Sequence, residues 1–262
     1  MSARLFVCLM AVCFSAHAQW LNYPAPGTPR TRDGKPNLSG PAPRAANGKP
    51  DLSGVWQVEP TTADELKRLF GDLSGENVLG DSSTAFSKYL INILADFKPT
   101  DMPLRPEFAS IVRQRAKEVY PLTRCLPVGV PADDVLPGPF KVIQTPGLIL
   151  IRNEYENTLR QIYLDGRKPP ADPDPLWLGY SVGKWEGNTL VVDTVGLNDK
   201  SWLDASGSPH SEALHVVERF HRRDFGHMDV EVTIDDPKMY TKPFSIQFTE
   251  DLIPDSDVTE YF

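Results

Sequence analysis

Apolar residues occupy every second position over residues 228–234 and again over 244–248, with polar residues between them. This period of two is typical of antiparallel strands that have one buried face. The run 148–151 is apolar at every position, as in a strand covered on both faces. Further strands are expected at 55–58, 140–145, 158–164, 178–184, 188–194 and 214–223.

Eight to ten short strands at this spacing predict a mainly β fold, either an antiparallel barrel or a strongly curved sheet. The pair Gly187-Asn188 can supply the positive φ of a tight hairpin between two of the strands. The segment 183–191, with sequence GKWEGNTLV, is similar to the G-x-W-x-G-[DN]-x-L hairpins of lipocalin-like and fatty-acid-binding-protein-like barrels. We therefore expect a lipocalin-like barrel with a few packing helices and an extended N-terminal arm.

The segment 62–120 follows a helical pattern in three places. Thr62 and Glu65 have capping-box spacing, residues 86–97 carry one apolar stripe, and Pro106 opens a third segment. The stripe of this third segment consists of Phe108, Ile111, Val112 and Val119. We expect all three helices to pack against the core.

Residues 1–18 form a predicted signal peptide. Arg4 precedes an apolar run over 5–14, and Ala16 and Ala18 give an A-x-A pattern with cleavage before Gln19. The run is about half the roughly 20 residues that span a bilayer, so no retained anchor or later membrane span is expected. We expect a periplasmic or secreted protein with residues 19–54 as an arm and 55–262 as a single β-rich domain.

The arm is rich in Pro, Gly and Asn and contains a duplication. The sequence DGKPNLSG at 33–40 recurs as NGKPDLSG at 47–54. In each copy a Gly turn is followed by a Pro that excludes helix, so both copies should lie extended over the domain.

Charge and cysteine content narrow the range of partners. The formal charge is −8, and loss of Arg4 with the signal peptide changes it by −1 to −9, which disfavours nucleic acid and anionic membranes. Cys125 is the single cysteine after residue 18, so no intrachain disulfide is expected. Two interpretations stay open for it: an inert buried thiol, or a thiol whose partner lies beyond Phe262.

The chain resembles a family of exported proteins common in soil bacteria, especially acidobacteria. The matching segments, which span roughly residues 33–262, are GKPDLSGVW at 48–56, RQIYLDGR at 160–167, WEGNTLVVDT at 185–194 and the region 202–220. The resemblance implies no activity. Family members often end in a short cysteine-containing tail, which is the source of the second interpretation of Cys125.

Four histidines, His210, His215, His221 and His227, lie within eighteen residues. On the strand 214–223, His215 and His221 share a face but are six residues apart, roughly 20 Å, which is too far to bind one ion together. No H-x-H or H-E-x-x-H spacing is present, so we expect no metal site and no cofactor.

The opposite face of this strand carries Glu218 among apolar residues, and Arg160 has a similar position on the strand 158–164. Burying either charge alone is costly. One interpretation is a structural ion pair between Glu218 and Arg160. The other is that both line a cavity, where Arg160 orients a ligand and Glu218 is a base whose pKa is raised by burial.

The loop 196–213 is the second candidate site. Here Trp202 could close over a ligand, with Asp204 and His210 as an acid and base pair. The alternative is that these residues are ordinary turn formers.

Two functions follow from these patterns. The first is an exported barrel that binds an apolar or aromatic small molecule, contacted by Arg160, Tyr163, Trp202, Arg219 and His215. The second is a cell-envelope isomerase, lyase or hydrolase that uses Glu218, Asp204 and His210 in the same cavity. An envelope protein that binds the arm is a further expected partner class.

Overall fold

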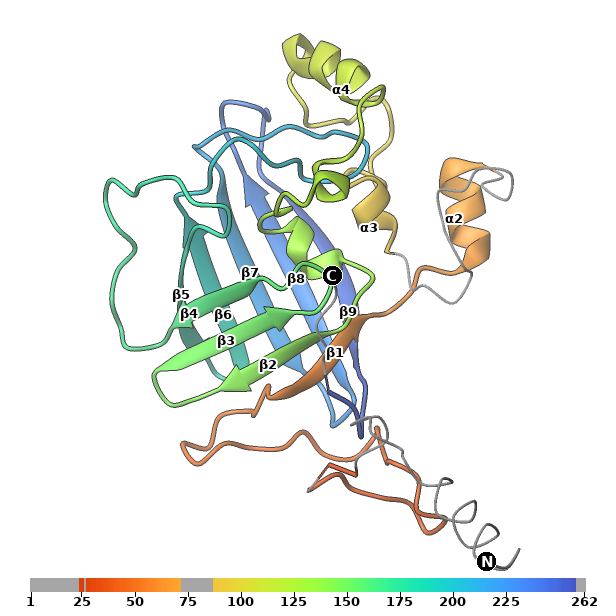
Figure 1. The fold of residues 1–262 in the computed structure, drawn as a ribbon, viewed down its shortest axis with the longest axis vertical. Helices are drawn as coiled ribbons and strands as arrows, with labels where there is room; N and C mark the ends of the chain where they lie inside the picture. The colour runs from red at the N-terminus through yellow and green to blue at the C-terminus, as the bar shows by residue number, and fades with distance from the viewer. Residues whose placement is uncertain (1–23, 26, 72–86, 258–262) are drawn as a thin grey trace, which may run out of the picture.

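The computed structural model describes residues 24–25, 27–71 and 87–257. Nine strands close into one barrel in which each strand pairs with its neighbours in the chain and the first pairs with the last (Figure 1). The fold is therefore mainly β, as the alternating pattern predicts. The strands are β1 Gly54–Val58, β2 Phe140–Gln144, β3 Leu148–Asn153, β4 Leu159–Tyr163, β5 Tyr180–Glu186, β6 Thr189–Val195, β7 His215–Arg222, β8 His227–Asp235 and β9 Phe244–Leu252.

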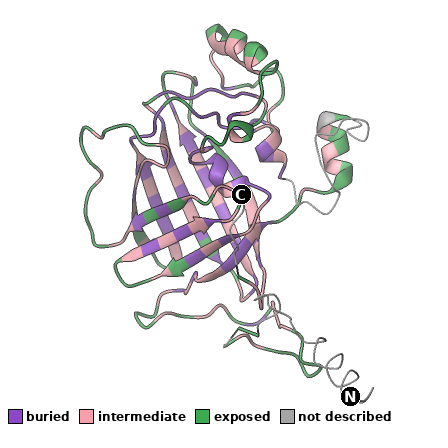
Figure 2. Ribbon diagram, in the orientation of Figure 1, coloured by how far each residue is buried: buried purple, intermediate pink, exposed green. Residues whose placement is uncertain are grey.

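Buried and less buried residues alternate along the long strands, and the buried ones form the core (Figure 2). In β8 the four buried residues Met228, Val230, Val232 and Ile234 alternate with half-buried polar residues. Trp56 of β1 is fully buried and adds the largest side chain of the core. The period of two in the sequence thus predicts correctly which residues of β8 face the inside of the barrel.

The strands β4 and β5 differ from the expected pattern because they run parallel. Their ladder has only two residue pairs, Ile162 with Ser181 and Tyr163 with Val182. The connection between them covers residues 164–179, and a parallel pair needs a crossover of about a dozen residues or more. The expectation of a wholly antiparallel barrel was wrong at this seam.

The hairpin between β5 and β6 turns at Gly187 and Asn188, as the sequence predicts. Glu186 pairs with Thr189 across the turn, and Gly187 has a φ of 62°. A side chain at this position would strain the backbone, whereas glycine adopts positive φ readily.

Short helices lie at one end of the barrel (Figure 1). Tyr89 and Leu90 bury α3 against the core. The expectation that the stripe of the third segment packs into the core was wrong, because α4 has no buried residue and Val119 is 55% exposed. The helical elements are α2 Ala63–Phe70, α3 Lys88–Ile91 and α4 Ala109–Arg115, together with the 3₁₀ helices η1 Pro106–Phe108, η2 Pro121–Arg124 and η3 Ala132–Val135.

The two copies of the arm repeat fold alike. Arg30 bridges to Pro36 in the first copy, and Arg44 to Pro50 in the second. In each copy the arginine guanidinium donates to a turn carbonyl, that of Gly34 or Gly48. The same sequence therefore produces the same small hairpin twice.

Arg222 at the end of β7 holds the arm against the barrel. Its guanidinium donates to the backbone carbonyls of Asp51 and Ser53 in the second copy and to those of Asp224 and Phe225 in the β7–β8 turn. It also lies 4.8 Å from the ring centre of Trp56. A single charged side chain thus joins arm, turn and core.

Cys125 ends η2 with a φ of 58° and is exposed and free within the described part of the chain. The interpretation of a buried thiol was therefore wrong. The predicted signal peptide, residues 1–18, lies outside the described residues. Within the described ranges, no helix combines the length and the apolar character that crossing a bilayer would require.

Replacing Arg222 with Met should lower the free energy of unfolding by about 2–4 kcal/mol, because four partly buried carbonyls lose a charged donor. The arm should also become the first site of limited proteolysis. Urea unfolding and protease mapping measure both effects. Arg223→Met is the control, since its side chain is half exposed and should change stability by less than about 1 kcal/mol. Equal effects of the two substitutions would contradict this role.

Candidate functional site

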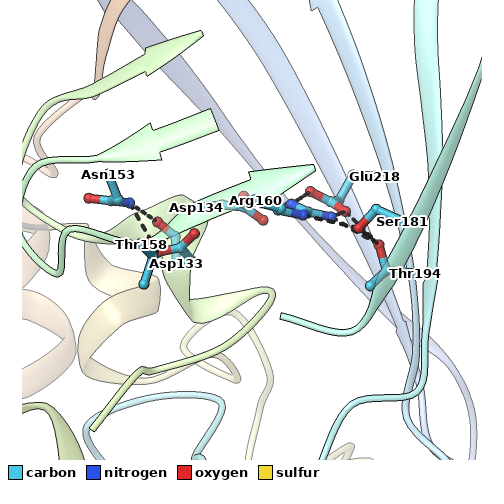
Figure 3. Close-up of polar contacts among 8 residues, drawn as sticks. All are labelled: Asp133, Asp134, Asn153, Thr158, Arg160, Ser181, Thr194 and Glu218. Atoms are coloured by element: carbon cyan, nitrogen blue, oxygen red, sulfur yellow. Dashed lines mark hydrogen bonds and ion pairs between the residues drawn. The ribbon is translucent and has the colours of Figure 1, made fainter. Parts of the chain in front are cut away.

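Arg160 of β4 and Glu218 of β7 form an ion pair inside the barrel (Figure 3). Arg160 Nη1 donates to Glu218 Oε1 at 2.6 Å, and Nη2 donates to Oε2. The side chains are 2% and 0% exposed. Of the two interpretations that the sequence allows, the ion pair is the arrangement found.

The same guanidinium reaches two more strands. Its Nε donates to Ser181 Oγ on β5 at 3.2 Å, and Nη2 donates to Thr194 Oγ1 on β6 at 2.9 Å. Arg160 therefore links β4 to β5, β6 and β7. These contacts cross the seam where the backbone ladder is shortest, so the cluster stabilises the closure of the barrel.

The 3₁₀ helix η3 brings two more carboxyl groups to the cluster (Figure 3). Asp134 Oδ1 lies 3.6 Å from Arg160 Nη1. Asp133 accepts hydrogen bonds from Asn153 Nδ2 at 3.0 Å and Thr158 Oγ1 at 3.4 Å. One arginine thus faces more carboxyl groups than it can neutralise.

Two of the acidic groups carry oxygen atoms that have no hydrogen-bond partner among the described residues, Asp134 Oδ2 and Glu250 Oε2. Burial, together with the nearby Glu218 charge, raises the pKa of Asp134 well above its ordinary value. Burial and then the charge of Asp134 raise the pKa of Glu250 in the same way. Both carboxyl groups therefore keep their protons to higher pH than exposed carboxyl groups do.

The acidic region extends outward from the cluster. Burial raises the pKa of Asp133 to about 6. Burial and the charge of Asp133 raise the pKa of Glu156 to about 8, while the Glu156 carboxylate accepts from the Val128 amide. This region of the barrel thus contains several carboxyl groups whose charges raise one another's pKa.

The loop 196–213 is packed into the protein. Asp204 is fully buried and accepts from the Ile93 amide and from the amide and hydroxyl of Ser208. His210 Nε2 lies 2.8 Å from Ser201 Oγ, and burial lowers the pKa of the ring. Asp204 and His210 therefore have separate structural partners, and the contacts give no acid and base pair.

Trp202 in this loop is 6% exposed. Its ring centre lies 5.8 Å from that of Tyr120, and the Arg115 guanidinium lies 5.0 Å from it. The side chain is thus packed beneath the segment that includes α4 and η2. It is held by the contacts with Tyr120 and Arg115, unlike the movable cover that the sequence suggests.

The apolar half of the barrel interior is nearly filled. A cavity between the side chains there has a volume of only about 10 Å³, which is the room needed by one water molecule. A larger ligand would have to displace core side chains. The lining residues include Leu52, Phe140, Ile162, Phe220 and Met228.

The remaining predicted ligand-binding residues lie outside the barrel. His215 Nε2 is 3.0 Å from Asp193 Oδ1 on the surface. Tyr163 lies beneath the guanidinium of Arg167, 3.7 Å from its ring centre. Neither residue is brought to the Arg160 cluster.

Arg219, on the outer face of β7, lines a groove of about 520 Å³ that crosses β6 to β9. One row of outward side chains runs across the strands in register, from His221 through Asp229 to Thr249. The neighbouring row runs from Arg219 through Glu231 to Gln247. Donors and acceptors therefore alternate on a rigid surface, which we call the outer groove.

Sequence reasoning missed Asp134, Glu250 and the outer groove. Glu250 occupies one of the alternate, inward-facing positions of β9 and could have been found by the reasoning that identified Glu218. Asp134 follows a Pro-containing segment without periodicity, so no pattern marks it. To predict the groove one must know which residues of neighbouring strands lie side by side, and the alternation within one strand does not give this.

Among the residues that the structure describes, no three His, Cys, Asp or Glu side chains form a group suited to a metal ion. No family model, curated protein or solved structure matches the chain. The function must therefore be argued from the geometry.

Replacing Arg160 with Met should lower the free energy of unfolding by about 3–5 kcal/mol, because Glu218 remains buried without its cation. The double variant Arg160→Met with Glu218→Leu should recover most of this loss, since apolar groups of similar size replace both charges. Urea unfolding of the three proteins measures this difference. A double variant as unstable as the single one would show that an unpaired buried charge is not the cause of the lost stability.

Stability should fall as pH rises from about 4 to about 8. In this window the unfolded chain releases its carboxyl protons first, whereas the raised pKa values of the folded state, about 6 for Asp133 and about 8 for Glu156, delay their release, as do the raised pKa values of Asp134 and Glu250. Glu250→Gln should make the fall shallower and raise stability above wild type at pH 8. Unfolding free energies at pH 5, 6.5 and 8 test this, with the outward-facing Glu231→Gln as the control. A profile unchanged by Glu250→Gln would refute the assignment.

Proposed function

We propose that this protein is an exported β-barrel that binds a small polar molecule in the outer groove. The observation that carries the proposal is the groove itself, about 520 Å³ lined by regularly spaced donors and acceptors on four strands. Small-molecule sites commonly have volumes of about 300–1,000 Å³. The export part of the proposal rests on the signal-peptide pattern of residues 1–18.

The rigidity of the groove supports a role in ligand binding. Its side chains project from neighbouring antiparallel strands whose ladders run through the groove, and sites on such elements keep their geometry better than sites on loops. Several lining groups have only long or partial contacts. Thr189 Oγ1 lies 3.3 Å from His221 Nδ1, and Gln247 Nε2 donates to Glu231 Oε2 at 3.5 Å. They keep hydrogen-bonding capacity for a ligand.

The chemistry of the lining favours a polar ligand over the apolar or aromatic one expected from the sequence. An apolar ligand inside the barrel would have to displace side chains around a cavity of about 10 Å³. In the groove it would cover charged groups without pairing them, which is unfavourable.

Binding is also favoured over catalysis. Glu218 is held by Arg160, Asp204 by Ser208 and the Ile93 amide, and His210 lies against Ser201. Each predicted catalytic side chain therefore has a partner that stabilises the fold.

The test is a titration with four probes, glucose, glycine, succinate and naphthalene, followed by NMR of the histidine rings. At least one polar probe should shift the His221 signals and leave those of His215, which lies on the same strand outside the groove, unchanged. Arg219→Gln should weaken that binding by about tenfold or more, equivalent to about 1.4 kcal/mol.

The control for this substitution is Arg167→Gln, whose guanidinium pairs with Asp165 on the surface and should not affect binding. The proposal fails if no polar probe moves the His221 signals. It also fails if naphthalene binds and Arg219→Gln leaves its affinity unchanged.

A further inference from the structure

The segment 128–136, which contains η3, is buried in the protein without being part of the sheet. Every residue of it except Asp134 is buried, and the Asp134 side chain is 9% exposed. Within the described chain, no residue of this segment belongs to a strand or to an isolated bridge. Its position therefore depends on side-chain contacts and packing. We call it the η3 segment.

Side chains of the β3–β4 hairpin hold the η3 segment at two points. Asn153 Nδ2 donates to the backbone carbonyl of Asp133 at 3.2 Å and to its carboxylate at 3.0 Å. Thr158 Oγ1 donates to the same carboxylate at 3.4 Å. The Val128 amide donates to Glu156 Oε1 at 3.0 Å. Carboxyl groups thus take part in the contacts at both points.

Acidic groups lie on both sides of the boundary between the η3 segment and the barrel (Figure 3). Asp133 and Asp134 belong to the segment, whereas Glu218 belongs to β7 and Glu250 to β9. Arg160 supplies positive charge, but its Nη1 and Nη2 both donate to Glu218, and Asp134 lies farther away at 3.6 Å. Ionised groups on the segment would therefore face carboxylates of the barrel across this boundary.

The closed segment accommodates neutral carboxyl groups better than charged ones. Asp134 Oδ2 and Glu250 Oε2 are buried and have no hydrogen-bond partner among the described residues, and burying an unpaired carboxylate is costly. Burial, then the Glu218 charge, raises the pKa of Asp134, and burial raises that of Asp133 to about 6. Water would solvate these charges once the segment opened.

The loop 196–213 covers the segment and brings no free charge to it. A Cβ on Gly129 would lie 2.9 Å from Ser201 Oγ, so the two backbones pack closely. The buried titratable groups of the loop are Asp204, which accepts from Ser208 Oγ, and His210, which lies 2.8 Å from Ser201 Oγ. Both are held within the loop.

The remaining elements against the segment leave its acids without a second cation. The helix α3 lies against η3 and carries Lys88 and Tyr89, and both side chains donate to Asp96. Tyr120 is a further titratable neighbour, and burial raises its pKa above the ordinary range. Burial and the Asp133 charge raise the pKa of Glu156 to about 8.

We propose that the η3 segment is a pH-sensitive closure of this end of the barrel, which stays packed while the carboxyl groups at its boundary are protonated and opens, with the strands still paired, when they ionise. Opening would bring water to Arg160, Ser181 and Thr194. This inference is independent of binding in the outer groove.

Closure should weaken as pH rises, because the closed form keeps its carboxyl protons to higher pH than the open form does. Asp133 has a pKa of about 6 in the closed form and would have one of about 4 when exposed. This residue alone would raise the equilibrium constant for opening about tenfold between pH 5 and pH 8. Asp134 and Glu156 would add to the change.

The experiment is hydrogen exchange of the full chain, followed by NMR at pH 5 and pH 8, with each rate divided by that of an exposed amide at the same pH. The amides of Val128 and Asp133, both hydrogen-bonded in the closed form, should show an opening constant that rises at least tenfold. They should also open more readily than the amides of Val230 and Val232 in β8, which is paired on both sides there.

Two variants remove one charge from each side of the boundary. Asp134→Asn, on the segment, and Glu250→Gln, on the barrel, keep the size of the neutral carboxyl group and should each reduce the rise severalfold. Asp174→Asn, exposed in the connection 164–179, is the control and should keep the full rise.

If Val128 and Asp133 exchange no faster than the β8 amides at either pH, the segment opens only with the whole barrel and the closure does not exist. An opening constant that stays the same from pH 5 to pH 8 would overturn the pH dependence. A rise that persists in full in both variants would overturn the role of the boundary carboxyl groups.

Discussion

The Arg160–Glu218 pair is the interaction on which the closed barrel depends. The parallel junction of β4 and β5 has two residue pairs, whereas neighbouring antiparallel ladders are longer. Arg160 contacts three strands beyond its own at this junction. Side-chain hydrogen bonds therefore supplement the short backbone ladder where two neighbouring strands run parallel. One buried side chain thus contacts all three strands that follow its own along the chain.

Closure has a consequence for where recognition takes place. In a closed barrel whose apolar interior is filled, a ligand can reach only the ends or the outside. One end is covered by the buried loop 196–213 and by η3, and the arm docks on the β7–β8 turn through Gly40 and Leu38. The outer faces of β6 to β9 remain, and their side chains project in register.

Parity along the chain was enough to predict the strands, the inward position of Glu218 and Arg160, and the glycine turn at Gly187. Each follows from local alternation or local backbone geometry. The parallel seam could not be predicted, because strand direction depends on a long connection without periodicity. The burial of Trp202 and His210 was missed because a loop's sequence does not reveal what covers it. Of the two interpretations of Cys125, the buried thiol rested on residue type alone, and the residue lies exposed in a left-handed conformation after η2.

The duplicated arm shows how a chain can be lengthened without disturbing a barrel. Within each copy the hydrogen bonds close locally, between Thr31 and Lys35 in one and Ala45 and Lys49 in the other. Contacts with the rest of the protein hold the copies in place, among them Asp255 for Arg30 and the Gly187 carbonyl for Lys49. Such a unit is a self-contained hairpin, and gene duplication can add one without shifting any strand. The junction at residues 41–42 is accordingly a natural place to graft foreign sequence.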